Sequence, residues 1–350
     1  MAAGGRQTPV QIWAGPLPGK ILDFSKMSLR RRLEGNVLMV DEALRDNMRI
    51  RSLMLAALIT LSSLSVVIAN DTVTTQDVDL SGNHTMTGNY TVSHGTTLTI
   101  KPGTTIDMQD YWMKVEGTLI ASNATIMSSI QTTGPGSHNA GVWEALTISS
   151  IGTATLDNVT ISNAKSCIIV DGTLNAKSLT IEDCLIGIEV DGTATIDDVS
   201  ISHVDHDGIR TTGNLDISMA IIDDVSGGIH SSGDLILSDA TFSNSGVGVA
   251  LTGGTADAEE LEFSTGVGNA LTISSGVTGD VEGMEGVATN AVVSVDSTGF
   301  AVSNIDMSGE RLVNSWSAGD LTISDSTFFA DSPETPIDLR TSGTVTLSNI

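Results

Sequence analysis

The sequence predicts an all-β fold, a parallel β-helix, and two observations predict it. Glycine heads a unit that recurs with steps of 20, 20, 21, 20 and 21 residues, at Gly152, Gly172, Gly192, Gly213, Gly233 and Gly254. Within each unit, apolar and polar residues alternate in short runs, which is the period of a half-buried strand. A fixed period in this range is typical of a solenoid, in which each coil buries its apolar side chains against its neighbours.

The unit that begins at Gly152 reads as three short strands separated by turns. Ala154 and Leu156 alternate with threonines in the first run, and the other two runs alternate in the same way. Turn-forming residues stand between the runs, at 157–158 and 163–165. Three strands in each coil of about 20–24 residues, with coils ~4.8 Å apart, predict a solenoid whose free edges lie only at its two ends.

Two upstream stretches extend the pattern: GTTLTIKPGTTI at Gly95–Ile106 and VEGTLIASNATI at Val115–Ile126. Together with the Gly-led units, they resemble the right-handed parallel β-helix repeat proteins of the pectate-lyase-like fold, from roughly Thr85 to the last residue. The hexapeptide period of left-handed β-helices is absent. The resemblance implies the fold and a secreted surface type of protein. It implies no single activity, because this fold carries lyases, hydrolases, adhesins and structural surface proteins.

The segment 48–69 has the features of a secretory signal peptide. Arg49 and Arg51 precede an uncharged apolar core at 53–68, and Val67-Ile68-Ala69 fits the small-residue cleavage pattern. The alternative is a transmembrane anchor, because the apolar run is close to the minimum length of a span. We expect export through a signal peptide.

The other segments follow from this interpretation. Residues 1–47 hold 7 of the 16 Lys and Arg residues and no repeat, so we expect a non-native upstream extension or a disordered segment. Residues 70–94 are predicted to form an N-terminal cap and the first coil. Residues 95–350 are predicted to form the β-helix. Because Gly343–Ile350 covers only part of a coil, we expect a chain truncated at its C-terminus.

The charge balance excludes one class of partner. The chain has a formal net charge of −26, and residues 70–350 keep 7 of the 16 basic and 37 of the 42 acidic residues, about −30. Nucleic acid is excluded because phosphate binding needs a basic surface. An anionic polysaccharide would be repelled unless divalent cations such as Ca²⁺ bridged it. We therefore expect an extracellular or cell-surface protein whose partners are carbohydrate or cell-envelope components, with membrane contact only through the signal or anchor segment.

Export gives meaning to the N-x-[ST] sequons, which are acceptors of N-linked glycans in secreted proteins. Asn158 is predicted to be the most accessible sequon of the repeats, because it stands at a turn. The candidate glycosylation sites are Asn70, Asn83, Asn89, Asn123 and Asn158.

The two cysteines, Cys167 and Cys184, fall in neighbouring coils. Alignment of the units places Cys167 outward near the third strand and Cys184 three residues earlier in its own coil. A disulfide would suit an exported protein, although this offset stretches the Cα separation of ~4.4–6.8 Å that disulfides require. The alternative is two small residues packed near a turn.

The densest polar cluster is HVDHDGIR at 203–210. Asp205 and Asp207 resemble part of a calcium loop, but a histidine stands at the first position of the pattern and no glutamate closes it. The alternative is a polar turn in which Gly208 supplies a positive φ.

Two columns of outward residues follow from stacking of the units. Glu189, Arg210 and His230 are predicted to be neighbours, with Glu189 and Arg210 as an exposed ion pair. With Asp205 and Asp207, the arginine and histidine are also candidates for acid–base catalysis on a sugar. We interpret the second column as polar turn residues whose side chains bond the backbone of successive coils. The alternative is calcium coordination by Asp183 and Asp224. The members of this column are Asn163, Asp183, His203, Asp224 and Asn244.

The motifs of known β-helix enzymes are mostly missing. Pectate lyases need clustered basic residues beside calcium-binding acids, but the 7 basic residues after position 69 lie in separate coils. Of the four polygalacturonase motifs, only Asp-Asp is present, at 197–198 and 223–224. Aromatic residues, which stack on sugar rings, make up 3% of the chain. We therefore expect a non-catalytic structural, adhesive or ligand-displaying role, and a secreted polysaccharide lyase or glycoside hydrolase is the alternative.

Three stretches interrupt the repeat. Ser128–Ala145 is an insertion that predicts a surface loop, in which Trp143 either contributes to binding or covers the interior of the coil. Gly276–Thr298 shows no clean strand pattern and is predicted to bulge. Pro333 and Pro336 predict a third turn insertion.

Overall fold

The computed structural model describes residues 66–69, 71–130, 141–296, 299–315, 320–330, 337–340 and 344–350. All of them belong to the second of two compact units, Ile59–Ile350. Residues 1–65, Asn70, most of the insertion at 131–140, and Pro333 and Pro336 lie outside the described residues. No helix in the described ranges is long and apolar enough to cross a membrane.

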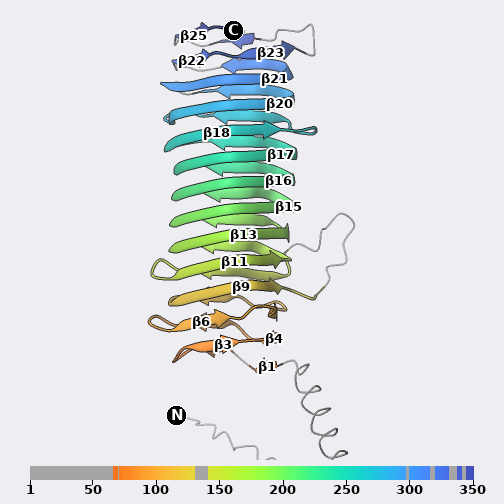
Figure 1. The fold of residues 1–350 in the computed structure, drawn as a ribbon, viewed down its shortest axis with the longest axis vertical. Coiled ribbons are helices and arrows are strands. Elements are labelled where there is room, and N and C mark those ends of the chain that lie inside the picture. The colour runs from red at the N-terminus through yellow and green to blue at the C-terminus, as the bar shows by residue number, and fades with distance from the viewer. Residues whose placement is uncertain are drawn as a thin grey trace, which may run out of the picture. The chain divides into compact units, whose positions relative to one another are not determined.

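The described residues form 25 strands that belong to one sheet. Figure 1 shows these strands stacked as successive coils along one axis, from β3 near one end to β25 at the other. All pairings between coils are parallel, for example Thr173↔Thr193 and Ile188↔Ile209. The stack has about 12 turns. The predicted all-β, right-handed parallel β-helix is therefore confirmed.

The first coils consist of short strands. They are β1 (Val66–Ala69), β2 (Thr72–Val73), β3 (Val78–Leu80), β4 (Asn83–Thr87), β5 (Tyr90–Val92), β6 (Thr97–Ile100), β7 (Thr105–Asp107), β8 (Met113–Val115) and β9 (Thr118–Met127). Strand β1 pairs with β4, so strand pairing begins within the segment predicted to be the signal peptide.

The middle coils match the Gly-led units, and several of their strands run around the bends of the coil. They are β10 (Trp143–Ile148), β11 (Thr153–Ser162), β12 (Ala164–Val170), β13 (Thr173–Cys184), β14 (Ile186–Val190), β15 (Thr193–Thr211), β16 (Asn214–Ser231), β17 (Asp234–Leu251), β18 (Thr255–Phe263) and β19 (Asn269–Ile273). The last coils are β20 (Thr278–Val295), β21 (Phe300–Ser315), β22 (Leu321–Ser324), β23 (Thr327–Ala330), β24 (Ile337–Leu339) and β25 (Val345–Ser348).

Each regular coil has three sides that meet at three corners. At two of the corners a single residue with positive φ bends the chain, a conformation that Asn and Asp tolerate better than most residues. The first corner is the column Asn123, Asn158, Ser178, Asp198, Met219, Asp239, Glu260, Gly283, Asn304, Asp325 and Asn349. The second corner is the column Asn163, Asp183, His203, Asp224 and Asn244.

The third corner carries the repeating glycine. In Gly172, Gly192, Gly213 and Gly233, a Cβ atom would overlap the carbonyl oxygen of the lead glycine in the preceding coil. Only a residue without a side chain allows the coils to approach this closely. The period of glycine in the sequence is therefore a consequence of close packing between backbones.

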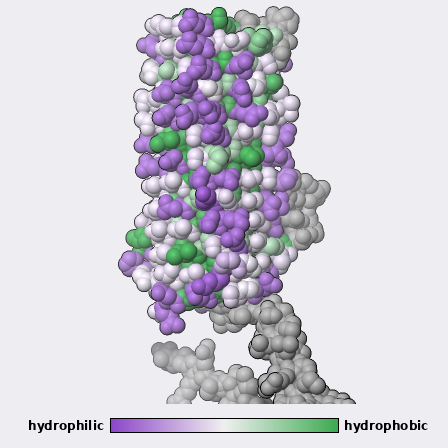
Figure 2. Space-filling view, viewed as in Figure 1, coloured by the Kyte–Doolittle hydropathy of each residue, from purple (hydrophilic) through white to green (hydrophobic). Residues whose placement is uncertain are grey.

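The core is a set of inward columns that continue from coil to coil. One of them is Leu156–Ala176–Ile196–Ile217–Leu237, and every member is at most 7% exposed. Phe242 and Phe263 continue another column and stack with ring centroids 5.3 Å apart. The outer surface differs from this core: Figure 2 shows hydrophilic and intermediate residues over most of the visible face, with hydrophobic residues scattered among them.

Trp143 covers the interior of its coil at the end of the insertion. The side chain is fully buried, and its Nε1 donates a hydrogen bond to the carbonyl oxygen of Ser162 at 2.7 Å. Of the two roles considered for Trp143, the structure thus shows the packing role.

The prediction that Gly276–Thr298 has no clean strand is wrong, whereas the predicted bulge is present as a register shift between Ala288 and Ala291. Strand β20 runs through most of this stretch and pairs with β18, β19 and β21. The pattern was obscured by Gly279, Gly283 and Gly286, which have positive φ. At Gly279 and Gly286 a Cβ atom would also overlap the backbone of the preceding coil. Glycine therefore stands where the alternating pattern expects a side chain, and the strand continues through it.

Cys167 and Cys184 form a disulfide in the structure, with Cα atoms 6.0 Å apart. The outward position predicted for Cys167 is wrong, because both cysteines are fully buried. Strict alternation fails in β12, where Ser166, Cys167 and Ile168 are buried consecutively. The partner strand β10 carries a register shift opposite this point, between Ala145 and Leu146. This irregularity turns Cys167 into the interior.

Candidate functional site

The predicted polar cluster lies on the outer surface of the third side, within strand β15. The expectation that Gly208 supplies a positive φ in a turn is wrong, because it lies inside the strand and is absent from the positive-φ glycines. Glycine is needed here for lack of space. A Cβ atom at this position would lie 3.0 Å from the carbonyl oxygen of Gly228 and 3.2 Å from a methyl group of Ile222. Gly208 therefore permits close packing of neighbouring coils.

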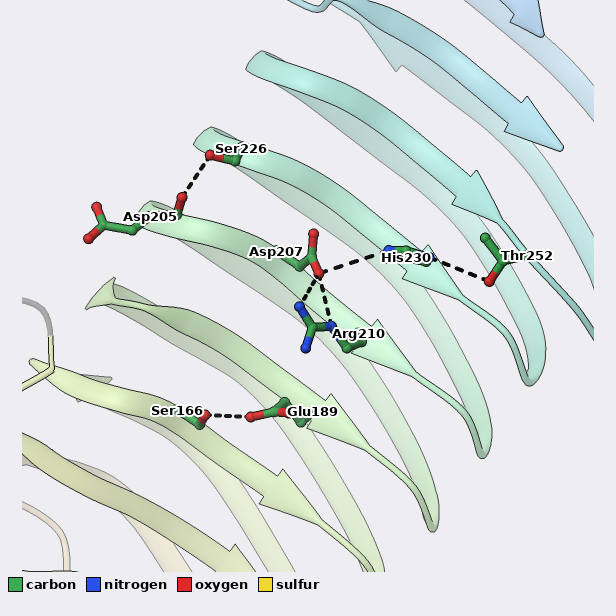
Figure 3. Close-up of polar contacts among 8 residues, drawn as sticks. All are labelled: Ser166, Glu189, Asp205, Asp207, Arg210, Ser226, His230 and Thr252. Carbon is green, nitrogen blue, oxygen red and sulfur yellow. Dashed lines mark hydrogen bonds and ion pairs between the residues drawn. The ribbon is translucent and has the colours of Figure 1, made fainter. Parts of the chain in front are cut away.

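Asp207 is the centre of the cluster. Its Oδ2 accepts hydrogen bonds from Arg210 Nε at 3.0 Å and Nη2 at 2.8 Å, and lies 4.0 Å from Nδ1 of His230. Nε2 of His230 is 3.4 Å from Oγ1 of Thr252 on the next coil. Figure 3 shows these residues aligned across three successive coils. The side chain of Asp207 is 17% exposed, whereas those of Arg210 and His230 are 45% and 43% exposed.

These residues border an open depression of about 320 Å³. Its apolar lining includes Ile229, Val247 and Ala250, and its polar lining is His206, Asp207, Arg210, Ser226 and His230. A depression that places a carboxylate, a guanidinium and two imidazoles together can bind a polar group, and a carboxylate beside an imidazole can transfer protons.

The predicted column is correct in register but wrong in its ion pair. Glu189 pairs with Arg210 and Arg210 with His230 in the sheet. The carboxylate of Glu189, however, accepts a hydrogen bond from Ser166, and Arg210 binds Asp207 of its own strand. A register shift between Val204 and Asp207 explains this choice, because it places Asp207 and Arg210 on the same outward surface.

Asp205 does not join the cluster. Figure 3 shows its carboxylate directed away from Asp207, Arg210 and His230, while its backbone carbonyl accepts a hydrogen bond from Ser226 at 2.7 Å. The sequence placed Asp205 and Asp207 in one loop, but both lie in strand β15, and the register shift between Val204 and Asp207 directs their side chains apart.

Asp183 and Asp224, the other calcium candidates, stand at the second corner with positive φ. Asp224 lies 3.9 Å from Nε2 of His203 in the adjacent coil. Hydrogen bonds from Ser243 and Asn244 hold the pKa of the neighbouring Asp223 below its usual value. These contacts link polar side chains at the same corner of successive coils. Within the described ranges, no three His, Cys, Asp or Glu side chains are placed to share a metal ion.

Sequence reasoning missed an acidic depression of about 470 Å³ near the first corner. Its lining includes Asp239, Glu260, Glu262, Glu285 and Asp306. Glu262, Glu285 and Asp306 stack directly over one another in adjacent coils. A hydrogen bond that the protonated carboxyl group of Glu260 donates to Asp239, and the repulsion between the two groups when both are charged, raise the pKa of Glu260 above its usual value. Alignment of the units beyond Gly254 would have revealed this column.

Replacement of Glu260 by glutamine is expected to raise the melting temperature at pH 7. A carboxyl group with a raised pKa in the folded state favours folding when it is protonated, and this contribution is lost as the pH rises through that pKa. Glutamine removes the repulsion, so the gain should vanish below about pH 4, where a carboxyl group is protonated in both states. Thermal unfolding at both pH values measures it.

The matched control is Asp197→Asn, which removes the same charge from a carboxylate that faces Lys177 at 3.5 Å. This variant should not gain stability at pH 7. Equal gains in the two variants would show that the overall negative charge, rather than the Asp239–Glu260 contact, is responsible.

The sequons are placed on the surface where the structure describes them. Asn83, Asn123 and Asn158 are exposed, and Asn89 is half-buried, with its Oδ1 accepting a hydrogen bond from the backbone of Trp112 at 3.3 Å. Asn70 lies outside the described residues.

Comparisons with known proteins identify no relative. No protein-family model, no curated protein and no solved structure matches this chain.

Proposed function

We propose that this protein is a secreted or cell-surface β-helix with a structural, adhesive or ligand-displaying role, and that it is non-catalytic. The observation that carries the non-catalytic role is the contrast between the inside and the outside of the coils. Inward columns stay apolar from coil to coil, whereas the outward column through Glu189, Arg210 and His230 changes chemistry at every step. Such a solenoid is a rigid support for a surface that varies freely.

The strongly acidic exported part supports an extracellular position in calcium-containing water, where divalent cations can bridge it to acidic envelope polymers. Carbohydrate or cell-envelope components are the proposed partners. The predicted signal peptide supports the same location.

A second candidate function, a carbohydrate-active enzyme, is favoured by one specific observation. Asp207 lies within reach of both Arg210 and His230 in an open depression. In this function, His230 would transfer the proton, Asp207 would orient its ring, and Arg210 would bind an acidic sugar group.

One experiment separates the two functions. The purified full chain is incubated with insoluble cell-envelope material and with neutral and acidic polysaccharides, with and without calcium. We expect the protein to sediment with envelope material, and we expect no new reducing ends and no unsaturated products.

Release of products that is lost in Asp207→Asn would establish the enzymatic function instead. Asp205→Asn is the matched control, because it removes the same charge two residues away from a carboxylate that points out of the cluster. Failure to sediment with any envelope material or polysaccharide would contradict the adhesive role.

A further inference from the structure

Two of the sequons lie directly over one another at the first corner. Asn123 and Asn158 occupy adjacent coils, since their flanking residues pair as Ser122↔Asp157 and Ala124↔Val159. Nδ2 of Asn158 donates a hydrogen bond to Oδ1 of Asn123 at 2.8 Å. Both side chains are exposed, and both residues have positive φ. The two acceptor amides are therefore about one coil spacing apart, ~4.8 Å.

The fold itself produces the N-x-[ST] pattern at this corner. Asparagine takes the positive φ, the next residue points inward, and the threonine after it points outward. Thr125 and Thr160 also pair with one another in the sheet. Two complete sequons are thus presented in register one coil apart, where two bulky glycans would compete for the same space.

The surroundings of the two asparagines differ. On the side away from Asn158, the corner position next to Asn123 is Gly103, whose backbone N–H donates to the carbonyl oxygen of Asn123 at 2.8 Å. Gly103 has no side chain, and a Cβ atom on it would meet nothing within 4 Å, so this neighbour places no side chain against Asn123. Asn158 instead lies between the side chains of Asn123 and Ser178.

We propose that Asn123 is the N-glycosylated member of this pair and that Asn158 stays unmodified. The inference rests on the proposed extracellular location, because N-linked glycans are added to exported chains. Nδ2 of Asn123 forms a bond to C1 of a lipid-linked oligosaccharide, the bond from C1 to the lipid phosphate breaks, and the amide loses one proton. The modified Asn123 keeps its Oδ1, so it still accepts the hydrogen bond from Asn158.

The test measures glycan occupancy at each sequon of the full chain, secreted from a host that performs N-glycosylation. Enzymatic removal of the glycan in heavy-oxygen water converts each modified Asn to a mass-labelled Asp, which mass spectrometry locates. We expect most molecules to carry a glycan at Asn123, with Asn158 at background.

Three variants separate the neighbour effect from other causes. Asn123→Ala removes the flanking side chain and should make Asn158 an acceptor, whereas Asn158→Ala should leave occupancy at Asn123 unchanged. Thr125→Val is the matched control: it abolishes the first sequon but keeps the Asn123 side chain in place, so Asn158 should stay unmodified.

Glycans on both residues of one molecule, a preference for Asn158, or a secreted chain modified only at Asn83 or Asn89 would overturn this inference and leave the proposed location intact. Modification of Asn158 in Thr125→Val would also overturn it, because the Asn123 side chain would then not be the obstacle. A chain retained in the cytoplasm would overturn both the inference and the proposed location.

Discussion

Replacement of Gly233 by alanine is expected to lower the free energy of unfolding by about 3 kcal/mol or more, because overpacking at a backbone contact cannot be relieved by a rotamer change. A Cβ atom at this position would lie 2.0 Å from the carbonyl oxygen of Gly213 in the preceding coil. The coils would have to separate, which would weaken the hydrogen bond from the Asp234 N–H to the same Gly213 carbonyl oxygen. Urea unfolding of the full chain, followed by circular dichroism, measures the loss.

Gly95→Ala is the control for this prediction. Gly95 has φ of +78°, and a Cβ atom there would meet nothing within 4 Å. Alanine at this position should cost only the strain of a left-handed backbone, about 1–2 kcal/mol. An effect of Gly233→Ala no larger than that of Gly95→Ala would contradict the view that close coil packing maintains the glycine period.

Replacement of Trp143 by alanine is expected to cost about 3–5 kcal/mol, the range for buried aromatic residues reduced to alanine. The indole is fully buried at the point where the chain re-enters the solenoid after the insertion. Its loss would leave a cavity and would also remove the hydrogen bond to the carbonyl oxygen of Ser162. Equilibrium unfolding in denaturant measures the change.

Trp143→Phe separates the two contributions. Phenylalanine keeps most of the ring volume but removes the donor, so the expected loss is about 1–3 kcal/mol, the cost of a buried acceptor without its partner. If Trp143→Ala were close to neutral, the tryptophan would be part of the surface loop and not of the core.

Much of the fold was predictable because inward columns repeat at fixed positions. The pairing of Glu189, Arg210 and His230 follows directly from alignment of the Gly-led units. The cluster around Asp207 was only partly predictable. Asp207 and Arg210 are three residues apart and would face opposite sides of a regular strand, but Gly208 and Ile209 are both buried and the register shifts nearby. An irregularity of one residue therefore decides which charges meet.

Irregularities also explain why the sequence-based predictions for Cys167 and for strand β20 were wrong. Cys167 was placed outward by strict alternation, and the glycines of β20 concealed a strand whose inward residues still fit the core. Alternation is a local rule, whereas a shift in register depends on the coils above and below. Residues beside such shifts cannot be assigned to a face from one coil alone.

Alternation within a coil and glycine at one corner were enough to predict the solenoid and its period, and composition was enough to predict its negative charge. Which outward side chains touch became visible only in the folded coils: Asp207 with Arg210, Asn158 with Asn123, and Glu260 with Asp239. These two kinds of interaction differ in the precision that they need. The core forms wherever apolar residues alternate at the repeat positions, but a hydrogen bond or charge contact between coils depends on side-chain positions to within about 1 Å.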